Sequence, residues 1–251
     1  MKLIELAECL STNSHLASIA RECPHGTVVY TRKQTAGRGQ RGNSWEAEPG
    51  KNITMSMLLR PDGLHPARQF VVSEAVSLAI VDVLTRHLPE MDVKIKWPND
   101  IYVGDRKICG ILIENSITST GITHSIVGIG LNVNQSVFCS DAPNPVSMRQ
   151  LTGEEYDLDA LIGEFSEEII SEVDAAIDAE RLGGGTAELE RRYFAALWRG
   201  DGEYYPYVDN LRGGEHVTAQ ILAVAPDGIL TLRLPSGELR SFAFKEVTAV
   251  V

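Results

Sequence analysis

The organisation of this chain follows from residues 93–114, which read VKIKWPNDIYVGDRKICGILIE. The stretch holds three short apolar or alternating runs: 93–97, 101–103 and 107–114. Runs of this length and period are typical of β-strands. Pro98 should force a turn out of the first strand, and Gly104 with Asp105 should form a hairpin turn between the other two. We therefore expect a sheet here, with turn residues at its strand ends.

Similar patterns continue on both sides of this stretch. Further strands are expected at 27–31, 53–59 and 122–131. A capped helix should begin at Ser11, a long apolar helix is expected over 67–88, and two amphipathic helices over 151–200. The sequence thus predicts a mixed α/β fold, in which helices flank a mixed sheet.

The last fifty residues change character. Apolar residues alternate from Val217 to Phe244, with turns at Pro226-Asp-Gly and Pro235-Ser-Gly. We therefore predict two domains, 1–200 and 201–251, the second a small all-β module.

Charge and composition exclude several classes of function. The 251 residues carry 23 Lys plus Arg and 34 Asp plus Glu, a net charge of −11, which argues against nucleic acid as a partner. The four cysteines show no metal-binding spacing, and the chain shows neither a membrane span nor a signal peptide, so we expect a cytoplasmic protein with reduced cysteines. Most acidic residues fall in 151–200, where we interpret them as solvated helix faces.

A glycine-rich loop, KQTAGRGQRGNSW at residues 33–45, is the most unusual segment. Its glycines at 37, 39 and 42 let the backbone approach a ligand, and Arg38 and Arg41 suit carboxylate or phosphate. The loop matches neither the P-loop nor a dinucleotide-binding motif. By itself it is equally compatible with an anion-binding loop and with an ordinary surface loop.

Two further segments carry polar residues at strand ends. In KWPND, residues 96–100, the side chains of Asn99 and Asp100 could face a ligand, and Lys107 opens the strand after the hairpin. In VGIGLNV, residues 127–133, two glycines permit close backbone approach, and Asn132 is the only polar side chain of an apolar strand. Taken alone, a lysine at a strand end is more often solvated, and a strand asparagine can be satisfied by a neighbour.

Taken together and in this order, these segments resemble the catalytic domain of biotin protein ligases. The resemblance runs from about residue 5 to the end of the chain, where the β module resembles that family's SH3-like barrel. It implies a class II synthetase-like fold, with ATP and biotin as substrates, Mg²⁺ as cofactor and a biotin carboxyl carrier protein as acceptor. Biotin would be activated as biotinyl-5'-AMP, with release of pyrophosphate, and then transferred to a lysine of the carrier.

The resemblance also implies roles for individual residues. Lys107 would bridge the biotin carboxylate and the α-phosphate beside Arg38, and Asp100 would orient or deprotonate the acceptor amine. The biotin-binding residues would be Ser11, Thr12, Asn13, Gln34, Arg38, Gly39, Gln40, Lys107, Gly110 and Gly128. The residues that bind ATP or the adenylate would be Gly37, Arg38, Arg41, Trp45, Asn99, Lys107 and Asn132. No side chain is assigned to the metal, and Phe138 is the candidate to cover the adenine.

Some residues depart from the family pattern, and some alternatives stay open. Gln40 and Asn43 stand where the loop is commonly richer in arginine, which puts the retention of the intermediate in doubt. Ten residues before Ser11 are too few for a helix-turn-helix domain, so we expect no DNA binding. A lipoate or octanoate transferase and a non-catalytic biotin-binding protein remain alternatives. A homodimer is compatible with the sequence but is not indicated by it.

Overall fold

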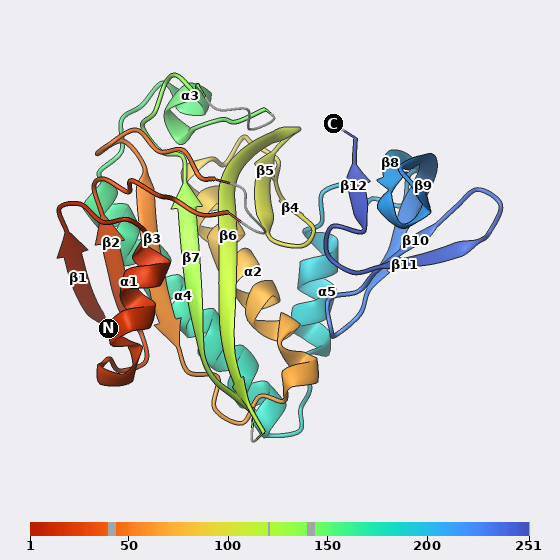
Figure 1. The fold of residues 1–251 in the computed structure, drawn as a ribbon. Helices are drawn as coiled ribbons and strands as arrows, with labels where there is room; N and C mark the ends of the chain where they lie inside the picture. Colours follow the sequence, from red (N-terminus) through yellow and green to blue (C-terminus); the bar gives the residue numbers. More distant parts are fainter. Residues whose placement is uncertain (40–43, 120, 140–143, 251) are drawn as a thin grey trace.

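A seven-stranded mixed sheet forms the centre of the computed structural model, which describes residues 1–39, 44–119, 121–139 and 144–250 (Figure 1). The strand order is β1-β2-β3-β7-β6-β5-β4. The bounds are β1 Lys2–Leu6, β2 Thr27–Thr31, β3 Ile53–Leu59, β4 Val93–Lys96, β5 Asp100–Val103, β6 Arg106–Thr118 and β7 Gly121–Leu131. β1 and β2 are parallel, and every other neighbouring pair is antiparallel. The expected mixed α/β class is confirmed.

Helices cover both faces of this sheet (Figure 1). α1 (Thr12–Ile19) packs on one face, where Leu16 meets a small apolar cluster with Val29 and Leu58. α2 (Phe70–His87) and α4 (Leu158–Arg181) bury the other face in the main core. α3 (Met148–Thr152), α5 (Ala187–Ala195) and three 3-10 turns, Ala20–Glu22, Pro66–Arg68 and Asn210–Arg212, complete the helical structure of the described residues. None of the helices in these residues is both long and apolar enough to cross a membrane.

A separate antiparallel sheet of five strands follows the helices, in the order β11-β10-β9-β8-β12. Its strands are β8 Tyr205–Asp209, β9 Glu215–Val224, β10 Leu230–Arg233, β11 Leu239–Phe242 and β12 Val247–Ala249. The expected all-β segment is therefore confirmed. The domain boundary at residue 200 and the SH3-like barrel remain proposals.

The structure corrects several sequence-based expectations. β1, β8 and β12 were not predicted, because each is short and lacks a long apolar alternation. β7 ends at Leu131, so Asn132 follows the strand. The last predicted helix ends at Ala195, because residues 196–198 pair with β4 instead: Ile95 N–H donates to Ala196 O (2.8 Å), and Trp198 N–H donates to Ile95 O (2.8 Å).

The acidic residues of α4 and α5 are only partly the solvated faces that we expected. Four arginines on other segments or helices pair with them, namely Arg32, Arg68, Arg86 and Arg192. Arg68 contacts Glu180 at 2.6 Å, and Arg192 contacts Glu172 at 2.5 Å. Since these pairs join residues far apart in the sequence, they tie the helices of this layer to one another.

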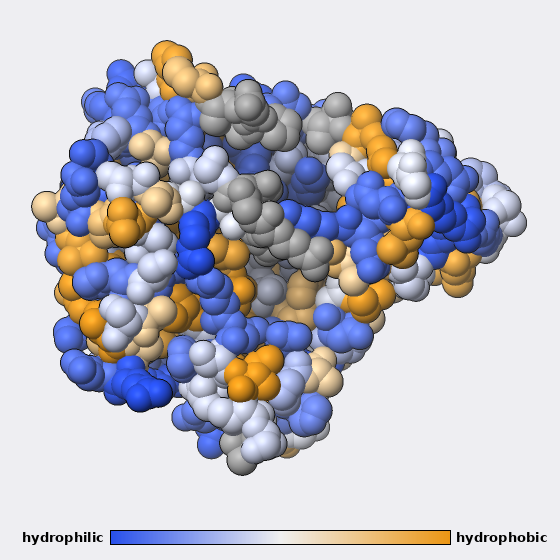
Figure 2. All heavy atoms as spheres, in the orientation of Figure 1, coloured by the Kyte–Doolittle hydropathy of each residue, from blue (hydrophilic) through white to orange (hydrophobic). Residues whose placement is uncertain are grey.

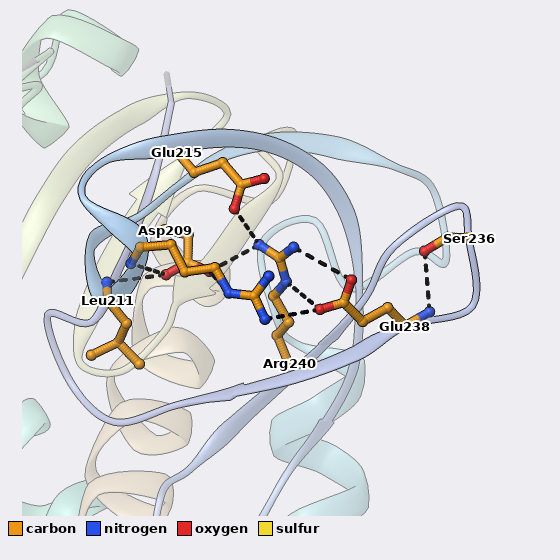
Figure 3. Close-up of polar contacts among 7 residues, drawn as sticks. Asp209, Leu211, Glu215, Ser236, Glu238 and Arg240 are labelled. Carbon is orange, nitrogen blue, oxygen red and sulfur yellow. Dashed lines mark hydrogen bonds and ion pairs between the residues drawn. The ribbon is translucent and has the colours of Figure 1, made fainter.

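An ionic cluster with a buried pair, Arg240 and Asp209, at its centre lies in the second sheet (Figure 3). The Arg240 side chain on β11 contacts Asp209 (3.0 Å), Glu215 (2.8 Å) and Glu238 (2.9 Å). Asp209, which is 1% exposed, also accepts backbone N–H groups of Leu211 and Arg212. One guanidinium therefore links β8, β9 and β11, and it compensates a carboxylate that is removed from water.

We expect Arg240→Met to destabilise this sheet, because it leaves the buried Asp209 carboxylate without its closest cation. The midpoint of thermal unfolding, measured by circular dichroism, should fall by at least about 4 °C. Arg212→Met is the control, since that side chain is exposed and lies 3.9 Å from Asp209. Equal midpoints for the two variants would contradict the role of the buried pair.

A second prediction concerns Glu74, a buried residue of α2 that is 1% exposed. Burial, with the nearby charge of Glu190, raises the pKa of Glu74 to about 8. In the unfolded chain this carboxyl ionises near its ordinary pKa of about 4.3, so the folded state holds the proton over a wider range. Folding therefore loses stability through Glu74 as the pH rises from about 4.3 to about 8.

Glu74→Gln should remove this loss, because Gln carries no charge at any pH. Unfolding by urea should show a stability gain that is small at pH 5 and larger at pH 8. An equal gain at both pH values would mean that Glu74 does not titrate in this way.

Candidate active site

A cavity of about 940 Å³ lies where the two sheets meet, and residues of both sheets line it. In Figure 2 the surface is hollowed where the C-terminal sheet projects from the main body. The lining contains these residues singled out from the sequence: Ser11, Thr12, Asn13, Gln34, Arg38, Gly39, Trp45, Asn99, Asp100, Lys107, Gly110, Gly128, Asn132 and Phe138. Gly37 is not among the lining residues. Gln40, Arg41 and Asn43 lie outside the described residues.

The strand register explains why distant segments meet here. Alternate residues of a strand face the same side of the sheet, so residues paired across strands form rows on one face. One row consists of Thr54, Gly130, Gly110 and Asp100. The next row consists of Ser56, Gly128 and Leu112. The β-strands thus present two adjacent rows in which, apart from Leu112, every residue is small or polar, with glycines at the centre.

The central glycines let two other side chains lie directly against the sheet. A Cβ at Gly128 would overlap the amide of Asn13, and one at Gly130 would overlap the indole of Trp45. At Gly110 the added Cβ would lie 2.9 Å from the Trp45 ring. The glycines of 127–133 therefore permit a close approach to the backbone, as expected. The groups that approach it are the side chains of Asn13 and Trp45.

Lys107 and Asp100 form an ion pair within the cavity. Lys107 Nζ lies 2.7 Å from Asp100 Oδ1, and both side chains are only about a quarter exposed. The backbone of Lys107 is fixed on both sides, because its N–H donates to Asn144 O (2.8 Å) and its carbonyl accepts from Val146 N (2.9 Å). The ammonium is therefore held at a defined point, where it can meet an anionic ligand.

The turn that carries Asp100 is held from three directions. The Asn99 amide donates to Ile111 O, and Tyr193 on α5 donates its hydroxyl to Pro98 O (3.1 Å). The Trp97 indole donates to Gly228 O (3.0 Å) in the C-terminal sheet, and the Trp97–Pro98 bond is cis. We expected the Asn99 side chain to face a ligand, but its amide N–H group donates a hydrogen bond within the protein instead.

Polar side chains gather at the start of α1. Ser11 caps the helix by accepting from Ser14 N, as expected, and Thr12 N donates to Gln34 Oε1 (2.9 Å). Asn13 Nδ2 donates to Glu114 Oε2 (2.7 Å). Because these groups face the cavity from one end, they can pair with the polar atoms of a neutral ligand.

Within the described residues, no contact links the Arg38 side chain to Lys107. Its guanidinium lies 3.2 Å from Glu114 Oε2, at the end of the cavity where Asn13 lies. The expectation that Arg38 stands beside an anion next to Lys107 therefore requires the side chain to leave Glu114. The arginine is about half exposed, which leaves it room to move.

Asn132 lies directly after β7, and only one of its two side-chain polar atoms makes a hydrogen bond. Its Nδ2 donates to Val146 O (3.1 Å), whereas its buried Oδ1 has no hydrogen-bond partner in the described part of the chain. A buried acceptor without a partner is costly. Asn132 is therefore a lining residue with an unsatisfied acceptor.

Several lining residues were missed by the sequence analysis. Lys96 was quoted without a role, yet its ammonium donates to Tyr102 OH (3.0 Å), and burial lowers the pKa of Lys96. Ser56 and Glu114 do not line the cavity but contact the lining residues Thr12 and Asn13, and they were read only as strand residues. The C-terminal sheet supplies Phe244, Lys245 and Thr248 to the same wall, and no local pattern could have placed these residues near Lys107.

The described residues contain no group of three or more His, Cys, Asp or Glu side chains suited to hold a metal ion. All four cysteines are unpaired, as predicted. The site therefore provides cations, hydrogen-bond donors and hydrogen-bond acceptors, and it provides no preformed side-chain metal centre in this part of the chain.

Comparison with known proteins gives a consistent result. The model of the Biotin/lipoate A/B protein ligase family matches residues 8–132. The Biotin--[acetyl-CoA-carboxylase] ligase of Paracoccus denitrificans is 35% identical over 159 residues, which cover 61% of this chain and 65% of that protein. The Bifunctional ligase/repressor BirA of Bacillus subtilis is 37% identical over 140 residues, which cover 53% of this chain and only 42% of that protein.

A biotin protein ligase from Aquifex aeolicus, solved in complex with biotin and ATP, shares the fold at a TM-score of 0.74 and 23% identity. The alignment covers 98% of this chain and 97% of that one, so the likeness includes the C-terminal sheet. Through the region of residues 8–132, the chain belongs to the biotin/lipoate A/B protein ligase family.

Proposed function

We propose that this chain is a biotin protein ligase. It activates biotin with ATP to biotinyl-5'-AMP, releases pyrophosphate, and transfers biotin to a lysine of a biotin carboxyl carrier domain. The observation that carries this proposal is the position of the Lys107 ammonium, fixed by Asp100 in a cavity whose other end presents Thr12 and Asn13. The relatives named biotin ligases support the same reaction.

Two anions must meet for activation, namely the biotin carboxylate and the α-phosphate of ATP. A fixed cation between them stabilises the charge that develops as the carboxylate attacks phosphorus and pyrophosphate leaves. Lys107 is assigned this role. Arg38 is assigned to the same anions after it leaves Glu114, and Arg41 to the departing phosphates.

The adenine is assigned to the wall near Asn132 and Phe138. The unpaired Oδ1 of Asn132 is suited to accept from the exocyclic amine, which is the donor that adenine carries. Trp45 and the glycines at 110 and 130 would border the ligand along the sheet. Mg²⁺ would enter with the nucleotide phosphates, since the described side chains do not fit a metal site by themselves.

In the second step, the carrier lysine attacks the mixed anhydride and AMP leaves. Asp100 remains the candidate to orient the incoming amine. It lies 2.7 Å from the Lys107 ammonium, beside the point assigned to the reacting anions. The acceptor would be recognised by its exposed lysine at the cavity mouth.

A lipoate or octanoate transferase is the rival within the same family. A dithiolane or alkyl head has no N–H group, so it could not donate a hydrogen bond to the polar residues at the α1 end of the cavity. A ureido ring offers two N–H donors and a carbonyl acceptor. The polar set therefore favours biotin.

Exchange of labelled pyrophosphate into ATP, with and without biotin, tests the proposal. Lys107→Ala should reduce biotin-dependent exchange by at least about 100-fold, because the developing charge loses its fixed cation. Lys94→Ala, whose ammonium pairs with Asp92 outside the cavity, is the matched control and should keep its activity. No biotin-dependent exchange by the wild-type chain would reject the function, and exchange driven by lipoate would favour the rival.

Arg38→Ala should shorten the lifetime of biotinyl-5'-AMP on the protein, since a cation near the adenylate is lost. Release of labelled adenylate after rapid gel filtration would be faster by about tenfold. Arg32→Ala is the control, because Arg32 pairs with Glu5 outside the cavity. Equal release from Arg38→Ala and wild-type protein would remove Arg38 from this role.

A further inference from the structure

Four side chains form a continuous hydrogen-bonded chain from the start of α1 to β6. Thr12 Oγ1 lies 2.7 Å from Ser56 Oγ, and Ser56 Oγ lies 2.5 Å from Asn13 Oδ1. Asn13 Nδ2 then lies 2.7 Å from Glu114 Oε2. Ser56 and Glu114 were not singled out by the sequence, and Ser56 is fully buried on β3.

The donor and acceptor of each bond in this chain can be assigned from the groups themselves. A carboxylate only accepts, so the Asn13 atom facing Glu114 must be the NH₂ group. The same NH₂ group also faces Leu112 O at 3.4 Å, which is another pure acceptor. The amide oxygen of Asn13 therefore faces Ser56.

The remaining protons follow from this orientation. Ser56 has a single hydroxyl proton and must donate it to Asn13 Oδ1, which has none. The contact between Ser56 and Thr12 is then satisfied only if Thr12 donates. The other acceptor near the Thr12 hydroxyl, Gln34 Oε1, lies farther away at 3.3 Å and already accepts from Thr12 N.

Because Thr12 donates its hydroxyl proton to Ser56, its oxygen can only accept a hydrogen bond from a ligand in the cavity. Thr12 lines that cavity. We propose that Glu114 is a specificity-determining positioning residue: through Asn13 and Ser56 it fixes the Thr12 hydroxyl as an acceptor, which selects a ligand head with an N–H donor at that point. Glu114 itself need not touch the ligand.

This inference rests on the proposed function, since the ureido ring of biotin is the head that supplies such a donor. It explains why an acidic residue stands at this end of the site. A Gln in place of Glu114 could either donate or accept, so the whole chain of bonds could reverse. Thr12 would then also present its proton to the cavity, and selection for an N–H donor would be weakened.

The test measures the Kd of biotin by isothermal titration calorimetry on the full chain. Glu114→Gln and Thr12→Val should each raise Kd by about tenfold, which corresponds to one hydrogen bond. The double variant should also show an increase of about tenfold rather than about 100-fold, because both changes remove the same contact.

Ser56→Ala tests whether the hydrogen-bonded chain through Ser56, which we call the relay, carries the effect of Glu114 on biotin binding, as opposed to a general structural effect. It interrupts the chain of bonds while Glu114 and Thr12 stay in place, so Glu114→Gln should cause no further change in Kd in this background. Asn115→Ala is the matched control on β6, because its side chain contacts Gln69 and Ser125 instead. It should change Kd less than twofold and combine additively with Thr12→Val.

The outcomes distinguish the two claims. Biotin binding by the wild-type chain, with additive effects of Glu114→Gln and Thr12→Val, would overturn the relay and leave the proposed function standing. An undiminished effect of Glu114→Gln in the Ser56→Ala background would do the same. A wild-type chain that does not bind biotin would reject the proposed function and the relay together.

Discussion

The rest of the site depends on the absence of side chains where β6 and β7 cross its centre. Gly110, Gly128 and Gly130 lie in two adjacent rows of the sheet, and a Cβ at any of them would collide with Asn13 or Trp45. Because these positions carry no side chain, α1 can bring its first turn onto the sheet and the Trp45 indole can lie directly against the strands. The polar groups above the sheet are therefore set by backbone geometry before any ligand is present.

The reacting end of the cavity is stabilised in a different way. The turn at 97–100 accepts a hydrogen bond from α5 and donates one to β6 and one to Gly228 between β9 and β10, so three segments of the chain fix the position of Asp100. Asp100 in turn holds the ammonium of Lys107. A cation held in this manner needs little reorganisation when charge develops beside it, which is the condition under which electrostatic stabilisation is most effective.

The sequence predicted the central strands, the cap at Ser11 and the strand-end position of Lys107, because each depends on local period or turn chemistry. It could not predict that residues 196–198 add to β4, since that pairing depends on tertiary contact. Arg38 was assigned by resemblance to an anion, and its partner Glu114 went unnoticed because a strand glutamate carries no local signal. The wall formed by Phe244 and Lys245 depends on contacts more than 100 residues apart.

The shared cavity also has a consequence for the order of synthesis. Its second wall belongs to strands that begin at Tyr205, whereas Lys107 and the first turn of α1 are made much earlier. At translation rates of roughly 5–20 residues per second, a nascent chain spends a few seconds with the large sheet complete and the wall missing. The second wall of the site can therefore form only after the strands from Tyr205 onward have been synthesised.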